Sequence, residues 1–319
     1  MSETRILVRR RRVAFVVLAV SVLTGLTGCS DSSNAPTIGA PGGGDAYDQV
    51  ITSAPVADAA TISGSNWAAK VKKQGFLRVG GTDAGPLFSI KDPATGKLTG
   101  FDAGLSQMLA HYILGGSDVQ KLTKLTITTV DTRETLLQNN TVDAVFATYT
   151  ITEPRAQKVD FAGPYYESGD AIMVKKDNAS ITTIADLAGK TVATESNSTA
   201  ALALKQFAPK AKVLLFADDA SCVAAVQQGR ADAYVLDQGI LLSDASTNPA
   251  VKVVGTPFTK EPYGIGLPKS DPAAKTFVNA FLQKIFDSGD WTKLYQQTIG
   301  KVVQGQPPAL PKIGSVPGS

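Results

Sequence analysis

The stretch VDAVFATYTITEPRAQKVDFAGPYYESG, residues 142–169, changes character in its middle. It begins as an apolar run typical of a buried strand in a parallel sheet, and threonines and Arg155 then follow. A charged side chain is poor core material, because burying it without a partner costs several kcal/mol. The stretch therefore predicts a strand whose end opens into a site where an arginine fork binds an anionic group.

Strands and helices alternate on both sides of this stretch. Apolar residues at helical spacing indicate one helix over residues 101–114 and another that begins at Pro272, behind the cap Asp271. Short β-rich runs lie between the helices, from FLRVGG at residues 76–81 to ADAYVLD at residues 231–237. Such alternation is typical of right-handed βαβ units, so the sequence predicts an α/β fold with mostly parallel sheets.

A weak internal repeat divides this alternation into two halves. The helix, turn and strand around Asp143 recur around Asp232. Five residues beyond each aspartate, a polar residue ends the strand: Thr148 in the first half and Asp237 in the second. In open α/β sheets ligands bind at the carboxyl ends of strands, so we expect these two residues to face one cleft.

The amino-terminal end predicts export. Residues 1–28 contain the basic segment RILVRRRR and the apolar segment VAFVVLAVSVLTGL, and LTGC follows. This end resembles a lipobox, in which Cys29 becomes the first residue of the mature protein and carries the lipid that anchors it to the outer face of the cell membrane. The alternative is an uncleaved membrane-spanning anchor, for which about 14 apolar residues are few against a hydrocarbon core of about 30 Å.

Composition excludes several classes of function. Five arginines and one glutamate in residues 1–28 supply more positive charge than the formal +3 of the whole chain, so the mature protein is nearly neutral and gives no reason to expect nucleic-acid binding. The chain has one histidine, His111, and one cysteine after Cys29, Cys222. We therefore expect no metal, no cofactor and no Ser-His or Cys-His chemistry, and we expect Cys222 to be a buried, unreactive thiol without a disulfide partner.

Two segments are predicted to be flexible. Residues 29–65 and 303–319 are rich in Gly, Ser, Ala and Pro, and they show little periodicity. We expect the first to be a tether and the second to be a tail.

Four segments resemble the polar-amino-acid substrate-binding proteins of ABC importers, family 3. They are LTGFDAGLSQMLA, VDAVFATYTITEPRAQKVDFAGPYYESG, IADLAGKTVAT and DPAAKTFVNAFLQKIFDSGDWTKLY, and the similarity covers about residues 75–300. Within the family, the chain looks most like the glutamate- and aspartate-binding lipoproteins of Gram-positive uptake systems.

The resemblance implies a periplasmic-binding-protein-like fold of two α/β lobes joined by a two-segment hinge. Lobe one would comprise residues 66–168 plus 262–300, and lobe two residues 169–257. Such proteins close on one amino acid outside the cytoplasm and deliver it to the permease subunits in the membrane. We also expect a monomer.

An amino acid presents an α-carboxylate, and Arg155 suits it through two parallel hydrogen bonds to which Thr150 adds donors. The family places its carboxylate-binding arginine here, although it usually reads Thr-Pro-Glu-Arg where this chain reads Thr-Glu-Pro-Arg. The alternative is a surface arginine. Ser198 and Thr199 open a helix whose free N–H groups attract carboxylates, although helix capping alone also explains Ser198.

The α-ammonium requires an acceptor, and Asp237 matches the family's ammonium-binding aspartate, helped by the backbone carbonyl of Thr148. Capping of the following helix is the alternative role for Asp237. Asp83, in the loop after the first strand, and Tyr149 are further candidates, and Tyr149 suits core packing equally well.

The ligand's side chain depends on Arg133 and Glu195. The resemblance implies that Arg133 binds a second carboxylate, as in acidic-amino-acid binders, while its alternative is a solvated helix-start arginine. Glu195 would repel such a carboxylate if it pointed inward, and pairing with Arg133 would move the preference to glutamine or asparagine. We expect glutamate or aspartate, with glutamine or asparagine as the alternative.

An enzyme is a competing class of function. The fold also resembles that of cyclohexadienyl dehydratases, which use a carboxylic acid in the same cleft, and Glu195 would be that acid. Asp237 argues against this, because a keto acid would leave it unpaired. A receptor sensor domain is a third class and would need a membrane-spanning and cytoplasmic part.

Overall fold

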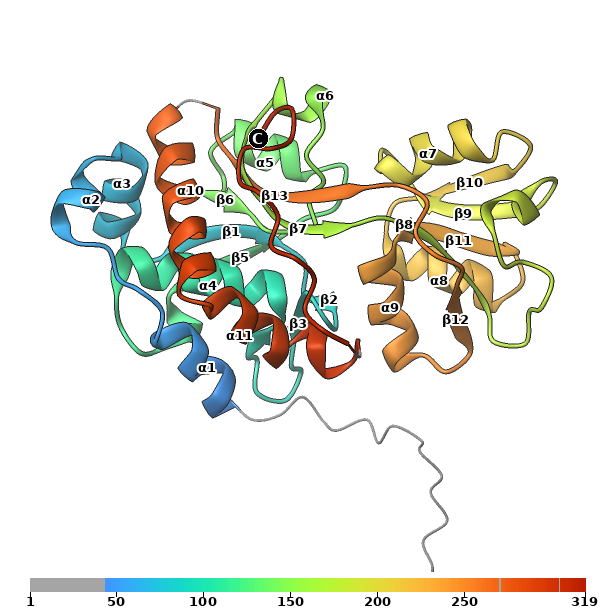
Figure 1. The fold of residues 1–319 in the computed structure, drawn as a ribbon, viewed down its shortest axis with the longest axis horizontal. Helices are drawn as coiled ribbons and strands as arrows, with labels where there is room; N and C mark the ends of the chain where they lie inside the picture. Colours follow the sequence, from blue (N-terminus) through green and yellow to red (C-terminus); the bar gives the residue numbers. More distant parts are fainter. Residues whose placement is uncertain (1–43, 270, 304) are drawn as a thin grey trace, which may run out of the picture. The chain divides into compact units, whose positions relative to one another are not determined.

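The computed structural model describes residues 44–269, 271–303 and 305–319, so the predicted signal segment and Cys29 lie outside the described residues. The described residues belong to one compact unit, Gly42–Ser319. This unit contains two five-stranded sheets, each with its own buried core (Figure 1). We call the elements around the first sheet lobe one and those around the second sheet lobe two.

The sheet of lobe one has the strand order β5-β1-β6-β13-β7. Strand β1 pairs in parallel with β5 and β6, whereas β13 runs antiparallel to β6 and β7. The strands are β1 (Leu77–Gly81), β5 (Thr123–Ile127), β6 (Ala144–Val145), β7 (Asp160–Ser168) and β13 (Glu261–Leu267). The helices of this lobe are α1 (Gly44–Thr52), α2 (Ala59–Ser63), α3 (Asn66–Gln74), α4 (Phe101–Leu114), α5 (Arg133–Gln138), α6 (Glu153–Ala156), α10 (Pro272–Asp287) and α11 (Asp290–Gln297), with the 3-10 turns η1 (Val119–Lys121) and η3 (Ile299–Lys301). A small antiparallel sheet is formed by β2 (Ala84–Gly85), β3 (Ser89–Lys91) and β4 (Leu98–Thr99).

The sheet of lobe two has the strand order β10-β9-β11-β8-β12. Strand β9 pairs in parallel with β10 and β11, and β8 runs antiparallel to β11 and β12. The strands are β8 (Asp170–Lys175), β9 (Thr191–Glu195), β10 (Lys212–Phe216), β11 (Ala233–Asp237) and β12 (Val251–Val254). Helices α7 (Thr199–Phe207), α8 (Asp219–Gln227) and α9 (Gln238–Thr247) cover it, and η2 (Ile184–Leu187) precedes β9. The predicted α/β fold with mostly parallel sheets is confirmed.

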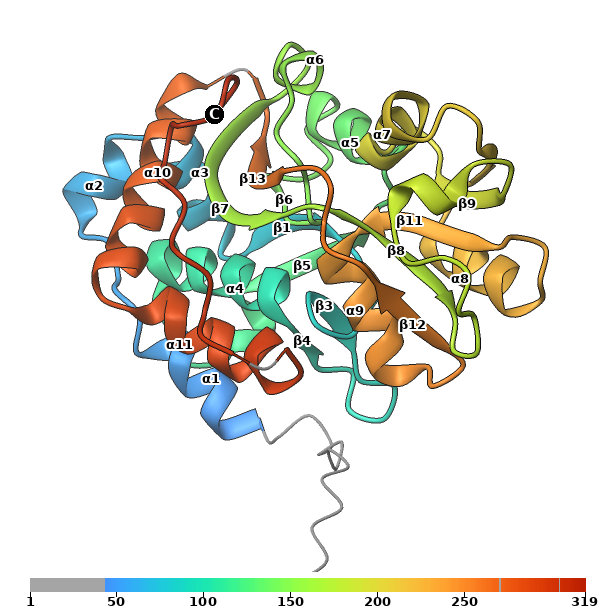
Figure 2. The same ribbon diagram turned by 45° about the vertical axis from the view of Figure 1, so that its right-hand side comes forward.

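Two chain segments connect the sheets (Figure 2). Gly169 alone separates β7 from β8, and residues 255–260 link β12 to β13. The two segments touch, because a Cβ atom at Gly169 would meet the carbonyl of Thr259. In addition, the backbone N–H of Asp170 donates to Thr259 Oγ1 at 2.7 Å. These connections form a narrow two-segment crossing at which the lobes can hinge.

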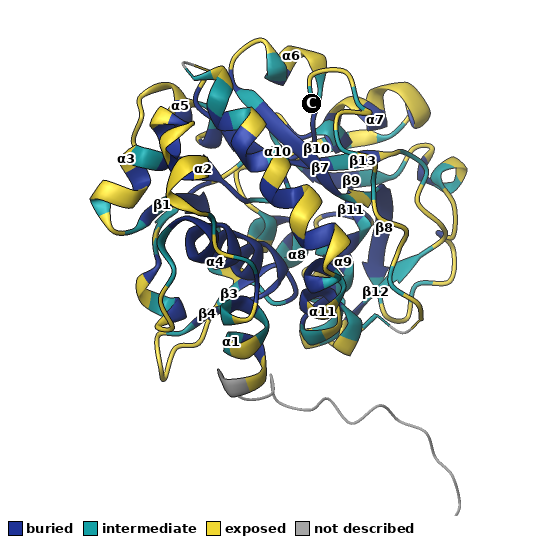
Figure 3. Cartoon of the chain, turned by 60° about the vertical axis from the view of Figure 1, so that its left-hand side comes forward, coloured by how far each residue is buried: buried dark blue, intermediate teal, exposed yellow. Residues whose placement is uncertain are grey.

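The helix signals in the sequence correspond to the observed elements. Ser65 caps α3 by accepting from the Ala68 N–H, and Gly75 ends the helix with a left-handed φ of 81°. Asp271 caps α10, as expected. Figure 3 shows that α4 is buried around much of its circumference. His111 near its end is buried, with Nδ1 2.9 Å from the Gly116 carbonyl.

The predicted tether is wrong from residue 44 onward. Helices α1 and α2 form there, and Ile51 of α1 is fully buried. The Tyr47 hydroxyl lies 3.1 Å from the Gly100 carbonyl and 3.0 Å from Gln107 Oε1. Two large apolar side chains one helical turn apart are enough to dock a short helix, whatever the composition around them.

The tail is likewise ordered against the fold rather than flexible. Val303 and Ile313 pack against the core of lobe one, and Val316 packs against a small cluster around Tyr149. The backbone N–H of Gly314 also donates to the Gly163 carbonyl at 2.8 Å. None of the described helices is both long and apolar enough to cross a membrane.

Candidate ligand-binding site

A cavity of about 320 Å³ lies where the carboxyl ends of strands from both sheets meet, which is in the range of small-molecule sites. Thr148 and Asp237 both line it, so the prediction that they face one cleft is confirmed. The other expected residues on its walls are Asp83, Arg133, Thr150, Arg155, Glu195, Ser198 and Thr199. Tyr149 is the exception, because it is fully buried in the core beneath the site.

Arg155 is on the wall of the cavity and not on the surface. It belongs to α6, which Thr152 caps, and it is only 8% exposed. One guanidinium nitrogen donates to the Thr150 carbonyl at 2.9 Å, and the other donates to the Asn197 carbonyl of lobe two at 3.3 Å. The guanidinium is therefore fixed by backbone carbonyls of both lobes, which orients it for bidentate binding of a carboxylate.

Asp237 ends β11 and is 5% exposed. Its carboxylate makes no capping bond to α9, so the capping role considered from the sequence is wrong. One carboxylate oxygen has no hydrogen-bond partner among the described residues. Burial, and next the negative charge of Glu261, raise the pKa of Asp237. A cationic ligand group is the partner that would satisfy such a carboxylate.

Two further carboxyl groups lie behind Asp237 at the hinge. Asp170 faces Asp237 in the β8–β11 register, and Glu261 opens β13. Both are buried, and both oxygens of Asp170 lack a hydrogen-bond partner within the described chain. Burial, followed by the charges of Asp237 and Glu261, raises the pKa of Asp170. The hinge therefore holds three buried carboxyl groups close together, and this arrangement favours the protonated form of Asp170.

Thr148 lines the cavity and has an unusual backbone conformation. It has a φ of 43°, a left-handed conformation that is uncommon for a non-glycine residue. Its N–H donates to Asp102 Oδ2 at 2.7 Å, and the Tyr165 hydroxyl donates to Asp102 Oδ1 at 2.8 Å. Burial raises the pKa of Asp102 to about 6, while those two donors oppose the shift. Asp102 thus positions the loop that carries Thr148 and Thr150.

Ser198 is the N-cap of α7 and accepts from the Ala201 N–H at 3.1 Å. Its hydroxyl also donates to the Glu195 carbonyl at 2.7 Å. Ser198 therefore caps α7, which is the alternative role considered for it from the sequence. Thr199 follows as the first residue of α7 and lines the cavity. The N-terminus of α7 and Arg155 therefore line the same cavity, and a helix N-terminus favours a bound anion.

Arg133 is 5% exposed, so the solvated alternative is wrong. Its guanidinium stacks 3.9 Å above the Tyr149 ring and donates to the Ala147 carbonyl at 3.1 Å. Its Nε atom has no hydrogen-bond partner among the described residues. Burial, and next the charge of Arg155, lower the pKa of Arg133 to about 10. Arg133 is therefore a buried cation with donor capacity to spare.

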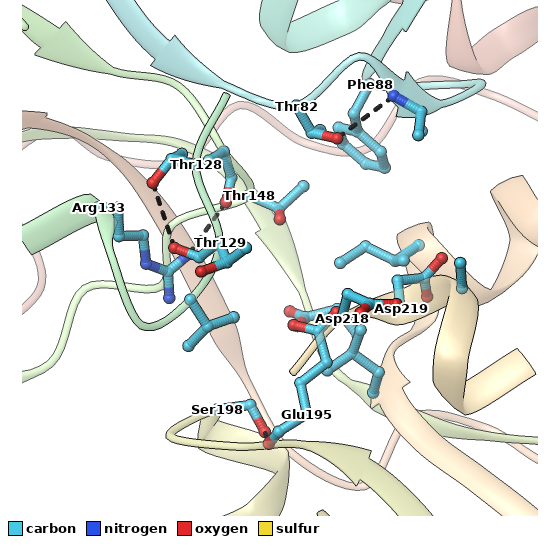
Figure 4. Close-up of a pocket in the computed structure, with 18 of the residues that line it drawn as sticks. Thr82, Phe88, Thr128, Thr129, Arg133, Thr148, Glu195, Ser198, Asp218 and Asp219 are labelled. Atoms are coloured by element: carbon cyan, nitrogen blue, oxygen red, sulfur yellow. Dashed lines mark hydrogen bonds between the residues drawn. The ribbon is translucent and has the colours of Figure 1, made fainter. Parts of the chain in front are cut away.

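Glu195 points to the cavity from lobe two, which the sequence left undecided. Figure 4 shows Arg133 on one side of the cavity and Glu195, Asp218 and Asp219 on the other. Burial, and next the charge of Asp219, raise the pKa of Glu195 to about 8. Both arginines of the cavity wall thus come from lobe one, and all of its carboxyl groups except that of Asp83 come from lobe two.

Direct hydrogen bonds join the lobes beside the cavity. Asp131 accepts from the Ser196 hydroxyl at 3.0 Å and from the Asn197 amide at 2.6 Å. On the other side of the cavity, the Leu87 N–H donates to the Ser243 hydroxyl at 3.0 Å. The structure therefore has its lobes in contact around the site.

Sequence reasoning missed Asp131, Asp102, Asp170 and Glu261. Asp131 lies just before α5, which begins at Arg133 behind Thr132, and its partners are in the other lobe. The only available signal for Asp102 was an acidic residue inside an apolar helix face. Cys222 is buried, as expected, and burial raises its thiol pKa.

Three comparisons relate the chain to known proteins. The profile of the bacterial extracellular solute-binding proteins, family 3, matches residues 77–301. A glutamine-binding protein of Geobacillus stearothermophilus is 35% identical over 258 residues, which are 81% of this chain and 92% of that protein. A glutamate-binding protein of Corynebacterium efficiens is 30% identical over 237 residues, or 72% of this chain and 80% of that one. The structure of an ancestral arginine-binding protein bound to glutamine is 36% identical, with a TM-score of 0.64, and covers 71% of this chain and 98% of its own.

Proposed function

The chain belongs to the bacterial extracellular solute-binding proteins of family 3, and from this premise we propose that it binds glutamate or glutamine between its lobes. Membership makes it the extracytoplasmic, amino-acid-binding component of an ABC importer, and its relatives are binding proteins rather than enzymes. The choice of ligand depends on the charged residues of the cavity.

Four charged residues of the cavity wall carry the proposal. Arg155 would take the α-carboxylate and Asp237 the α-ammonium, so any α-amino acid satisfies this pair. Arg133 and Glu195 then remain for the side chain. A terminal carboxylate or carboxamide offers oxygen atoms to the guanidinium, and the amide also offers N–H groups to Glu195. A purely apolar side chain would leave both charged residues without partners.

The ligand can be tested by calorimetric titration of the purified protein with glutamate, glutamine, aspartate, asparagine and arginine. We expect glutamate and glutamine to bind most tightly. Preference for arginine by tenfold or more would contradict the role of Arg133, because a second guanidinium would lie next to it.

Arg133→Ala is expected to weaken glutamate roughly a hundredfold and glutamine less than tenfold. Loss of a buried charge partner costs about 3–5 kcal/mol, and about 1.4 kcal/mol corresponds to a tenfold change. Arg230→Ala is the matched control, since Arg230 lies 5.6 Å from the Phe216 ring on an exposed site outside the cavity. If Arg133→Ala weakened the binding of glutamate and glutamine equally, Arg133 would not distinguish between the side chains of the two ligands.

We further propose that Cys29 carries the lipid anchor and that the protein acts as a monomer at the outer face of the cell membrane. The motif LTGC supports lipidation, and Cys29 lies outside the described residues. Cys29→Ala is expected to move the protein from the membrane fraction to the soluble fraction. Its retention on membranes after a salt wash would rule out the lipid as the anchor.

A further inference from the structure

Resting on the proposed function, we propose that Glu195 sets the ligand preference through its protonation: the neutral carboxyl group admits glutamate, and the ionised carboxylate restricts the site to glutamine. Three observations carry this inference: the position of Glu195, the absence of an ion pair at its carboxyl group within the described residues, and the charges around it.

Glu195 ends β9 at the rim of the cavity, and its backbone is fixed there. It pairs with Phe216 in the β9–β10 register, and its carbonyl accepts from the Ser198 hydroxyl at 2.7 Å. Its carboxyl group forms no ion pair with any residue in the described part of the chain. Arg133, on the opposite wall, also lacks an ion pair there and has an unpartnered Nε. A carboxyl group and a guanidinium thus lie on opposite walls of the cavity, and neither forms an ion pair within the described residues.

Two acidic residues on the same wall as Glu195, Asp218 and Asp219, already accept hydrogen bonds. Asp218 caps α8 by accepting from the Ser221 N–H at 2.8 Å. Asp219 accepts from the Tyr234 hydroxyl, also at 2.8 Å. Of these three residues, Glu195 is thus the one whose carboxyl group can change its bonding with the ligand's side chain, while Asp237 is assigned to the α-ammonium.

The charges around Glu195 favour its neutral form. The ionisable groups that interact with it are Arg133 of α5, Asp237 and Tyr234 of β11, Asp218 before α8, Asp219 and Cys222 of α8, and Asp244 of α9. Arg133 is the one cation in this set. Burial and the neighbouring acids together place the pKa of Glu195 at about 8, so its charge changes within an ordinary range of pH.

Each protonation state matches one ligand. A neutral Glu195 donates its O–H to the side-chain carboxylate of glutamate, whose negative charge is balanced by Arg133. An ionised Glu195 repels that carboxylate but accepts from the N–H₂ group of glutamine, while Arg133 donates to the amide oxygen. The only bond that forms or breaks is the O–H bond of the Glu195 carboxyl group, whose proton exchanges with solvent.

The experiment measures the dissociation constants of glutamate and glutamine by calorimetry between pH 6 and pH 9. The glutamate side chain, with an ordinary pKa of about 4.3, stays ionised throughout. The α-groups are common to both ligands, so their titration largely cancels in the ratio of the two constants. We expect this ratio to change toward glutamine by up to tenfold per pH unit as the pH rises, because the form that binds glutamate is lost while the form that binds glutamine is gained.

Glu195→Gln, which mimics the neutral form, is expected to give a ratio that does not depend on pH. Glu153→Gln is the matched control, because Glu153 is exposed on lobe one and its loss removes the same charge without touching the cavity; it should keep the wild-type profile. A flat ratio in the wild-type protein, or a sloping one in Glu195→Gln, would overturn the inference while amino-acid binding stands. If neither ligand binds at any pH, the proposed function fails together with the inference.

Discussion

Arg155→Ala is expected to weaken the binding of every amino acid by at least a hundredfold. The residue is buried in the wall of the cavity, and its guanidinium is held by the carbonyls of Thr150 and Asn197. Its removal leaves the ligand's α-carboxylate without a cation and also removes a hydrogen bond between the lobes. Loss of one partner of a buried ion pair costs about 3–5 kcal/mol, which exceeds a hundredfold in affinity.

The substitution Arg155→Lys separates charge from geometry. Lysine keeps the positive charge but cannot form two parallel bonds to a carboxylate, so an intermediate loss is expected. Calorimetry with glutamate and glutamine measures both variants, and Arg230→Ala should bind like the wild type. If Arg155→Ala bound either ligand within tenfold of the wild type, the α-carboxylate would have to lie elsewhere in the cavity.

Features that depend on local sequence were predictable. The periodicity of α4 and α10 and the caps Ser65 and Asp271 are set by residues within one or two turns. That Thr148 and Asp237 line the same cavity was predictable from a repeat and from the rule that ligands bind at the carboxyl ends of strands. The family resemblance supplied the candidate ligand residues, and the structure brings nearly all of them to one cavity.

Features that depend on contacts distant in sequence were not predictable. Nothing near Asp131 indicates that it bonds to Ser196 and Asn197 in the other lobe. The direction of the Glu195 side chain depends on the register in which β9 pairs with β10, where Glu195 lies opposite Phe216. Amino-acid composition does not predict that register. Helix α1 was hidden for a different reason: its two buried side chains are too few to form a periodic pattern within a segment rich in glycine and alanine.

The hinge carboxyl groups determine how the ligand-free protein responds to pH. Asp237 has a folded-state pKa raised above its ordinary 3.8, so the stability it contributes is present at low pH and is lost as pH rises through the raised value. Asp170 acts in the same direction. The ligand reverses this preference at Asp237, because an ammonium group pairs with the ionised form. Ligand affinity should therefore fall as the pH is lowered from 8 to 5, while the Tm of the ligand-free protein should rise.

Asp237→Asn is expected to separate these two effects. Asparagine keeps the size of the side chain but cannot pair with an ammonium group, so the affinity for glutamate and glutamine should fall at least a hundredfold and lose the decline toward low pH that depends on Asp237. The same change removes a carboxylate from beside Asp170 and Glu261, so the ligand-free variant should be more stable than the wild type at pH 8. One pKa unit corresponds to about 1.4 kcal/mol, and 1 kcal/mol moves the Tm of a large domain by roughly 2–4 °C, so calorimetry should show a rise of at least about 2 °C. A variant that lost both affinity and stability would show that Asp237 supports the fold. Weaker binding together with a higher Tm is the result expected if the Asp237 carboxylate binds the ligand's ammonium group and destabilises the ligand-free protein.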